Sequence, residues 1–336
     1  MKIPLKMDVT GCADWPQGFP AKVELATTVC LPDQPRSGKQ PILLFAFPGG
    51  GYSRHYFDLD LSHLPGCEGA SYSQADHHLA SGIIVVTCDH LHVGESTKTR
   101  QPELITLDML AAANAAMVDA VSSRLADGTL VEAAGPNAGL RCVGLGQSMG
   151  GAITIATQAA HGCFDAIAVL AHGVHGSVAV RPEDLDGLSA TGRLAFSDKR
   201  PGTKLPSMRE LWYAADVPQA IIDEDTKGGY PVRQTTPVYG SLTIPPCALN
   251  FIAPGFLASK AAKISVPVFI GYGDTDVLAE PDHEPAAYRS AASVEAAKFA
   301  TMGHMHNFAS TRQQLWDKLV AWMQELASER AEEATR

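Results

Sequence analysis

The sequence predicts an α/β fold in which a mainly parallel central sheet is flanked by helices. Short apolar runs that end in Gly, Pro or Asp alternate with longer, Ala-rich stretches of helical character. This rhythm is typical of parallel strands joined by helices. The runs show little alternation of apolar and polar residues, as expected for strands buried on both faces. With 336 residues, 46% of them hydrophobic, the chain can bury one large core and an inserted subdomain.

The individual elements follow from these runs in chain order. Strands are predicted at 42–47, 83–88, 141–145, 166–171 and 266–272, with a weaker one at 294–301. Helices are predicted at 71–80, 104–126, 150–160 and 311–327. The last helix carries Leu315, Leu319 and Leu326 at helical spacing, so one of its faces should pack on the sheet. The charged tail SERAEEATR is expected to fray.

Residues 173–262 interrupt this rhythm and are rich in Pro, Gly, Tyr and Asp. A long irregular insertion inside a compact domain is usually functional or disordered, and the aromatic content of this one argues against disorder. We therefore expect a lid over one end of the sheet, inserted between the sixth and seventh core strands. The α/β core would then consist of 1–172 and 263–336.

Composition and charge disfavour several classes of partner. A net charge of −10 and a pI of about 5.6 argue against binding to nucleic acid and to anionic membrane surfaces. No apolar stretch approaches the ~20 residues that span a bilayer, and the start of the chain lacks the apolar segment of a secretory signal. Seven scattered cysteines without a CxxC pair predict free thiols in the cytoplasm. The oligomeric state stays open, a homo-oligomer included.

The strongest motif is CVGLGQSMGG at 142–151, which contains a G-x-S-x-G pattern centred on Ser148. An apolar strand runs directly into the motif, and a helix-like segment follows it. In this setting the small neighbours allow a sharp turn that exposes the serine hydroxyl above the sheet. The serine also lies at a helix N-terminus, where backbone N–H groups favour developing negative charge. Ser148 is therefore predicted to be a nucleophile.

A nucleophilic serine needs a base and a group that orients the base. The strand VPVFIGY ends in GDTDVLAEP, which places Asp276 at the carboxyl end of a strand, where sites of open α/β sheets are built. Asp274 is the alternative acid, although its position favours a turn-capping role. After the weak strand comes MGHMHN, in which His304 is the predicted base and His306 its rival. A loop there would return a histidine toward Ser148.

The predicted oxyanion hole comes from the glycine-rich turn PGGGYSR that follows strand 42–47. Glycines leave backbone N–H groups unshielded and close to an incoming carbonyl oxygen. We expect the N–H of Gly50, or of Gly51, to act together with that of Met149. The turn lacks both a G-K-[ST] ending and GxGxxG spacing, so phosphate binding is disfavoured.

Three histidine-rich pieces invite a metal interpretation, at 76–78, 89–92 and 304–306. None has the spacing of an HExxH or a Cys/His zinc site, so no metal is predicted. Asp89 follows a strand directly and is expected to anchor the turn at 90–96.

Four landmarks now stand in order along the chain: PGGGY, GQSMG, GDTD and GHMH. On these motifs the chain resembles the α/β-hydrolase superfamily over nearly its full length, with 173–262 in the position of the family's variable lid. The segments GGGYSRHYF, PGFLASKAAKISVPVFIGYGDTDVLAEP and HMHNFASTRQQLW are similar to a lidded, esterase-like bacterial branch whose substrate is undefined. The chain order serine, acid, histidine agrees with the family. One departure is Pro48-Gly49, where the superfamily frequently has His-Gly.

The motifs and the resemblance together predict a serine hydrolase of carboxylic esters, an esterase or lactonase, without a cofactor. Its substrate is expected to be small to medium and partly apolar. The same triad also suits a C–C hydrolase, thioesterase, acyltransferase or cofactor-free haloperoxidase, because fold and triad set no substrate. A non-catalytic binding protein on this scaffold is a further alternative. Tyr52, Trp212 and Tyr213 are candidates for substrate contact, although such aromatic residues can equally form the lid's own core.

Overall fold

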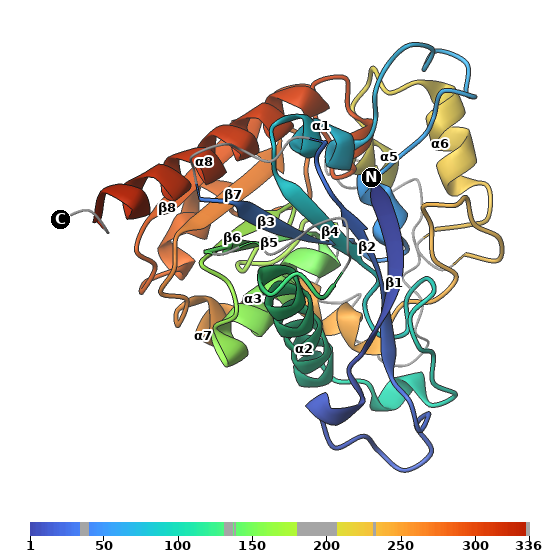
Figure 1. Ribbon diagram of the computed structural model, residues 1–336. Helices are drawn as coiled ribbons and strands as arrows, with labels where there is room; N and C mark the ends of the chain where they lie inside the picture. The colour runs from blue at the N-terminus through green and yellow to red at the C-terminus, as the bar shows by residue number, and fades with distance from the viewer. Residues whose placement is uncertain (34–39, 131–136, 138, 180–206, 231–232, 334–336) are drawn as a thin grey trace.

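The computed structural model describes residues 1–33, 40–130, 137, 139–179, 207–230 and 233–333, and an eight-stranded sheet forms its centre (Figure 1). The strands are β1 (Lys2–Asp8), β2 (Glu24–Cys30), β3 (Ile42–Phe47), β4 (Ile84–Cys88), β5 (Arg141–Gln147), β6 (Ala166–Leu170), β7 (Val268–Gly273) and β8 (Val294–Phe299). Their spatial order is β1-β2-β4-β3-β5-β6-β7-β8. β2 is antiparallel to both of its neighbours, whereas β4, β3 and β5 to β8 are parallel. The carboxyl ends of these six strands therefore meet at one edge, where sites of α/β sheets form.

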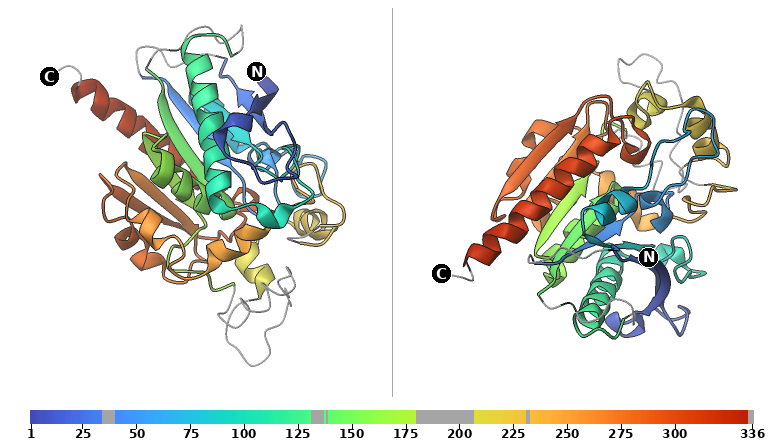
Figure 2. Two further views of the ribbon diagram at one scale, coloured as in Figure 1. Left: turned by 90° about the horizontal axis from the view of Figure 1, so that it is seen from below. Right: turned by 45° about the horizontal axis from the view of Figure 1, so that its top comes forward.

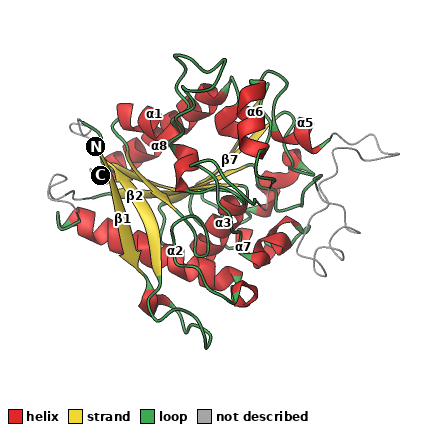
Figure 3. Cartoon of the chain, turned by 90° about the vertical axis from the view of Figure 1, so that its right-hand side faces the viewer, coloured by secondary structure: helices red, strands yellow, loops and turns green. Residues whose placement is uncertain are grey.

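Helices cover both faces of this sheet. They are α1 (Gln74–Ala80), α2 (Leu107–Ala126), α3 (Met149–His161), α5 (Met208–Trp212), α6 (Gln219–Thr226), α7 (Ala258–Ala261) and α8 (Arg312–Glu333). α2 and α3 pack on one face and α1 and α8 on the other, as the views in Figures 2 and 3 show.

The register of β3 explains why its sequence is apolar throughout. Leu43 and Phe45 belong to the core beneath α2 and α3, whereas Leu44 and Ala46 belong to the core beneath α8. Successive side chains of a strand point to opposite faces, so a strand covered on both sides needs apolar residues at every position.

The predicted α/β class is confirmed, and every strand and helix expected from the sequence is present. Two strands at the sheet's edge were not predicted, because β1 alternates exposed and partly buried residues and the apolar residues of β2 are interrupted by Glu24, Thr27 and Thr28. The tail expected to fray is helical up to Glu333. Leu315 and Leu319 are fully buried, as their spacing predicts.

The insertion lies between β6 and β7, and the structure describes it in part. Of the predicted lid, 180–206 and 231–232 fall outside the described residues, so the division at 173 and 262 stays a prediction. The described part contributes α5, α6 and α7. Among the described residues, no helix combines the length and the apolar character needed to cross a bilayer.

Candidate active site

Ser148 lies on a tight turn between β5 and α3. Its backbone has φ 53° and ψ −117°, a conformation that is costly for a residue with a side chain and persists only where the surroundings impose it. The flanking glycines explain the turn. A Cβ on Gly150 would lie 2.1 Å from the carbonyl oxygen of Phe47, and one on Gly146 would lie 2.2 Å from that of Gly150. Only glycine fits at these two positions, so the turn lifts Ser148 above the sheet.

Three side chains from separate strand ends form one hydrogen-bonded chain. His304 Nδ1 lies 2.7 Å from Asp276 Oδ1, and His304 Nε2 lies 2.9 Å from Ser148 Oγ. An ionised carboxylate can only accept, so the imidazole carries its proton on Nδ1 and accepts from the serine hydroxyl at Nε2. The side chains of His304 and Asp276 are 3% and 2% exposed, which shields this chain from water.

The Asp276 carboxylate is held from both sides. Oδ1 also accepts from the N–H of Val277 at 2.7 Å, while Oδ2 accepts from His306 Nε2 at 2.8 Å and from the N–H of Gly273 at 3.2 Å. Burial would raise the pKa of this carboxyl, but the two histidines keep the pKa well below its usual range. Asp276 therefore stays ionised and strongly oriented.

The two rivals from the sequence occupy other places. His306 contacts Asp276 Oδ2, whereas His304 contacts Oδ1 and Ser148. Asp274 accepts hydrogen bonds from the N–H groups of Thr301 and Met302 at 3.0 and 3.1 Å. It therefore ties the loop after β7 to the loop after β8, rather than capping its own turn as its position suggested.

The loop that carries His304 is clamped by the insertion and by β5. The N–H of His304 donates to the carbonyl oxygen of Leu211 at 2.8 Å, and the N–H of Met305 donates to that of Trp212 at 2.9 Å. Gln147 Nε2 donates to the carbonyl oxygen of His304 at 3.0 Å. Gln147 was not singled out in the sequence, because the x positions of G-x-S-x-G carry no signal for this contact.

Two backbone N–H groups beside Ser148 remain available to a ligand. Gly50 and Met149 both line the pocket, and within the described part of the chain neither N–H has a hydrogen-bond acceptor. Met149 is the first residue of α3, where N–H groups lack an intrahelical partner. Gly51 has φ 83° and lies outside the pocket lining, with its carbonyl oxygen hydrogen-bonded to Arg233 and Ser241.

Support for the glycine-rich loop comes from residues that follow β4. His90 Nε2 donates to the carbonyl oxygen of Pro48 at 3.2 Å, and its Nδ1 accepts from Asn114. Burial lowers the pKa of His90 to about 4, so the ring is neutral at neutral pH. A histidine from the neighbouring strand thus buttresses the loop that begins with Pro48-Gly49.

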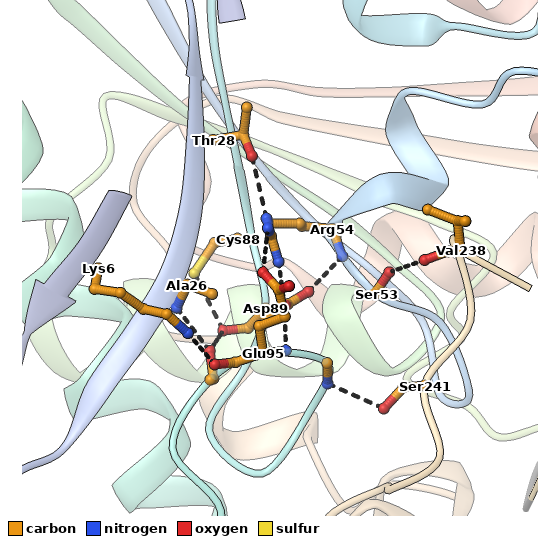
Figure 4. A network of polar contacts seen from close by, with 12 residues as sticks. Lys6, Ala26, Thr28, Ser53, Arg54, Cys88, Asp89, Glu95, Val238 and Ser241 are labelled. Atoms are coloured by element: carbon orange, nitrogen blue, oxygen red, sulfur yellow. Dashed lines mark hydrogen bonds and ion pairs between the residues drawn. The ribbon is translucent and has the colours of Figure 1, made fainter. Parts of the chain in front are cut away.

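Asp89 anchors the same loop from below, as Figure 4 shows. Its carboxylate accepts from the N–H of Arg54 at 2.5 Å and from Arg54 Nη1 at 2.7 Å. It also accepts from the N–H of Glu95 at 2.8 Å. Asp89 therefore anchors the turn at 90–96, as predicted, and joins it to the first residues after the glycine-rich turn.

A pocket opens above Ser148, and concave, mostly apolar pockets with a few polar groups are typical of small-molecule sites. The insertion supplies much of an apolar wall, through Trp212, Ile244, Leu249, Phe251 and Ile252. None of the described residues that line the pocket is Asp, Glu, Lys or Arg. The pocket therefore favours a neutral, largely apolar ligand.

His172 is a polar group in this wall that sequence reasoning did not select. It follows β6, lines the pocket and is 5% exposed. Its Nε2 has no hydrogen-bond partner among the described residues. Burial and the nearby His304 lower the pKa of His172 to about 4, which keeps the ring uncharged beside Ser148.

The three aromatic candidates for substrate contact separate in the structure. Trp212 lines the pocket, and its ring centroid lies 4.6 Å from that of His304. Tyr52 and Tyr213 do not line it, which corrects the expectation for both. Their hydroxyls donate to the buried carboxylate of Asp225 at 2.7 and 2.5 Å, so they hold the insertion's own core.

Solved structures with the same fold cover almost the whole chain. An esterase from Thermogutta terrifontis matches at a TM-score of 0.61 and 15% identity, covering 96% of this chain and 99% of the other. A bromoperoxidase from Bacillus anthracis matches with the same values. The enol-lactonase from Burkholderia xenovorans LB400 has a TM-score of 0.57 and 17% identity, covering 90% of this chain and 97% of the other.

Neither a protein-family model nor a curated protein matches the sequence. The sheet order, the strand-to-helix turn at Ser148 and the full-length structural matches nevertheless agree on one architecture. The chain has the fold of the α/β-hydrolase superfamily.

Proposed function

We propose that this protein is a serine hydrolase of carboxylic esters, an esterase or lactonase, with Ser148, His304 and Asp276 as its catalytic triad. The observation that carries the proposal is the continuous hydrogen-bonded chain from Asp276 through His304 to Ser148, which opens onto an apolar pocket. The esterase and the enol-lactonase that share the fold make ester bonds the first class to test.

In the proposed reaction, Ser148 Oγ attacks the ester carbonyl carbon while its proton passes to His304 Nε2. Asp276 stabilises the imidazolium that forms. The carbonyl oxygen becomes an oxyanion and accepts from the N–H groups of Gly50 and Met149. Collapse of this intermediate breaks the C–O bond, and His304 gives the proton to the departing alkoxide.

Water completes the cycle. His304 takes a proton from a water molecule, whose oxygen attacks the acyl-enzyme carbonyl. Collapse of the second intermediate breaks the bond to Ser148 Oγ, which regains its proton from His304, and the acid leaves. With a lactone the leaving alcohol stays attached to the acyl chain, so one hydroxy acid is released.

The pocket supports a neutral substrate with an apolar acyl or alcohol group. Its insertion wall is built from Trp212, Ile244, Leu249 and Phe251, and a buried charge without a partner would be strongly disfavoured there. Among the polar groups in the wall, His172 has a ring Nε2 without a hydrogen-bond partner among the described residues, so we expect it to orient such a substrate.

A substrate panel tests this function. Nitrophenyl esters from acetyl to octanoyl, a lactone and a thioester would be assayed with and without an acceptor alcohol. We expect ester or lactone turnover that Ser148→Ala lowers by about 10⁴-fold or more, while Ser328→Ala, exposed on α8, keeps full activity. Turnover that persists in Ser148→Ala would contradict the proposed function. So would activity only on thioesters, or only acyl transfer to the acceptor alcohol.

We also propose that the protein is located in the cytoplasm. All seven cysteines are free thiols, the state that reducing compartments maintain. Cell fractionation followed by detection of the chain should find it with cytoplasmic markers, and recovery from an oxidising compartment would contradict this assignment.

A further inference from the structure

The insertion is fastened directly to the loop that carries Gly50. Tyr52 forms an isolated antiparallel bridge with Gly240, and the N–H of Ser53 donates to the carbonyl oxygen of Tyr239 at 2.9 Å. These contacts join residues of the insertion to the glycine-rich turn itself. The orientation of the Gly50 N–H is therefore tied to the insertion.

A run of three glycines needs such restraint. Glycine loses more conformational freedom on ordering than any other residue. A backbone N–H whose orientation fluctuates contributes little to an oxyanion hole. Within the turn, the N–H of Tyr52 donates to the carbonyl oxygen of Gly49 at 3.2 Å. The Gly49 carbonyl and the Gly50 N–H belong to the same peptide group, so this bond restrains the orientation of the Gly50 N–H.

The insertion fixes the next two peptide planes. The hydroxyl of Tyr230 donates to the carbonyl oxygen of Gly50 at 3.3 Å. The carbonyl oxygen of Gly51 accepts from Arg233 Nε at 3.2 Å and from the N–H of Ser241 at 2.9 Å. Three successive carbonyl groups of the turn are thus each hydrogen-bonded, two of them by the insertion.

Arg233 is held by a carboxylate on α6. Its Nη2 lies 2.8 Å from Asp225 Oδ1, and both side chains are 0% exposed. The other carboxylate oxygen accepts from the hydroxyls of Tyr52 and Tyr213. Removing two charges from water costs desolvation free energy, and the attraction between the buried charges often fails to offset that cost. A gain in the stability of the fold is therefore a weak explanation for the Arg233–Asp225 pair. Its contact with Gly51 is a specific one.

We propose that Tyr230 and the buried pair Arg233–Asp225 are positioning residues that aim the Gly50 N–H at the oxyanion. This inference rests on the proposed function. Donors that are oriented in advance stabilise the transition state without reorganising during the reaction. Their loss therefore lowers kcat and leaves KM nearly unchanged, whereas loss of a purely structural contact lowers only the unfolding temperature.

Two variants and a matched control separate these outcomes. Tyr230→Phe removes a single hydroxyl, and the double variant Asp225→Asn with Arg233→Met removes both charges together, so that neither is left buried alone. Tyr239→Phe is the control, because this neighbouring hydroxyl has no partner among the described residues.

The readouts are kcat and KM for an ester, the unfolding temperature, and the inhibition constant of a trifluoromethyl ketone, whose adduct with Ser148 places an oxyanion in the hole. We expect kcat to fall about 10-fold in Tyr230→Phe and about 10²-fold in the double variant. KM should change by less than about threefold, and ketone binding should weaken by the same factors as kcat. Tyr239→Phe should match the unaltered protein in all four quantities.

The outcomes that overturn the inference are distinct from those that overturn the function. If the unaltered protein hydrolyses esters and Ser148→Ala does not, but both insertion variants keep kcat and ketone affinity, the positioning role is wrong and the function stands. If the unaltered protein neither turns over an ester nor binds the ketone at Ser148, the proposed function fails. The inference then falls with it, because no oxyanion forms.

Discussion

Ser148, Asp276 and His304 follow the carboxyl ends of the parallel strands β5, β7 and β8, whereas the opposite wall of the pocket comes from the insertion between β6 and β7. The sheet side is fixed by steric contacts that leave no alternative, such as the approach of Gly150 to the Phe47 carbonyl oxygen. The insertion side is fixed by hydrogen bonds that the carbonyl oxygens of Leu211 and Trp212 accept, by one that the Tyr230 hydroxyl donates, and by the buried Arg233–Asp225 ion pair.

This difference assigns different tasks to the two sides. In the proposed reaction, the sheet edge carries the groups that form and break bonds, and its geometry belongs to the fold itself. The insertion sets the shape of the pocket and restrains the loops around it. Changes on the sheet side should therefore reduce turnover of every substrate, whereas changes in the pocket wall of the insertion should depend on the substrate.

The largest loss of kcat is expected at His304, the first of the two histidines in the GHMH motif. His304→Gln should lower kcat by about 10³–10⁴-fold for all substrates, because the base that takes the Ser148 proton is gone. His306→Gln removes one of four donors to Asp276 and should cost only about 10-fold. Steady-state kinetics on a single ester distinguish the two. A larger loss in His306→Gln would reverse their assignment, and equal losses would contradict a special role for His304.

A substitution at one glycine tests whether steric contacts fix the turn that carries Ser148. Gly150→Ala should lower the free energy of unfolding by about 3 kcal/mol, because its Cβ meets backbone that cannot move aside. Gly11→Ala is the matched control, since a Cβ there has no neighbour within 4 Å, and should stay within about 0.5 kcal/mol. Denaturant unfolding measures both. A Gly150→Ala protein as stable as Gly11→Ala would disprove the steric account of the turn.

A pH-dependent effect is expected at His172, which stands on the sheet side and faces the pocket. Burial and the nearby His304 lower its pKa from 6.5 to about 4, so between these values the unfolded chain binds a proton that the folded chain does not. Stability is therefore lost as the pH falls below 6.5. The free energy of unfolding should drop by roughly 2 kcal/mol more between pH 7 and pH 5 in the unaltered protein than in His172→Asn. Identical pH slopes would argue against a buried neutral ring.

The smallest effect is expected in the apolar wall of the insertion. Leu249→Ala enlarges the pocket, so it should shift the ratio of kcat/KM for octanoyl over acetyl esters upward by about tenfold. Turnover of the acetyl ester should change little, because the triad is untouched. A uniform loss on both esters would mean that this wall supports the sheet side rather than selecting the substrate.

The sheet side was predictable because its signals are local. The G-x-S-x-G turn is defined by five adjacent residues between a strand and a helix, and parallel strands bring their carboxyl ends to one edge. That rule placed Asp276 and His304 near Ser148 without any knowledge of side-chain packing. The choice between His304 and His306 needed the geometry, because both follow the same strand two residues apart.

The insertion side was not predictable because its contacts are distant in sequence. Tyr52 and its partner Asp225 are 173 residues apart, and an aromatic residue beside a glycine-rich turn gives no sign of such a partner. Arg233 and Gly51 are separated by 182 residues. The irregular composition of 173–262 indicated an insertion, but hydrophobic periodicity, the main guide to structure in a sequence, is absent there.

The central claim is that Ser148 is a nucleophile activated by His304. The most direct test is to treat the protein with a fluorophosphonate and map the adduct by peptide mass spectrometry. We expect one phosphonyl group, on Ser148, formed rapidly in the unaltered protein and at least about 10²-fold more slowly in His304→Gln. No adduct on Ser148 in folded protein, or equal labelling rates in the two proteins, would contradict it.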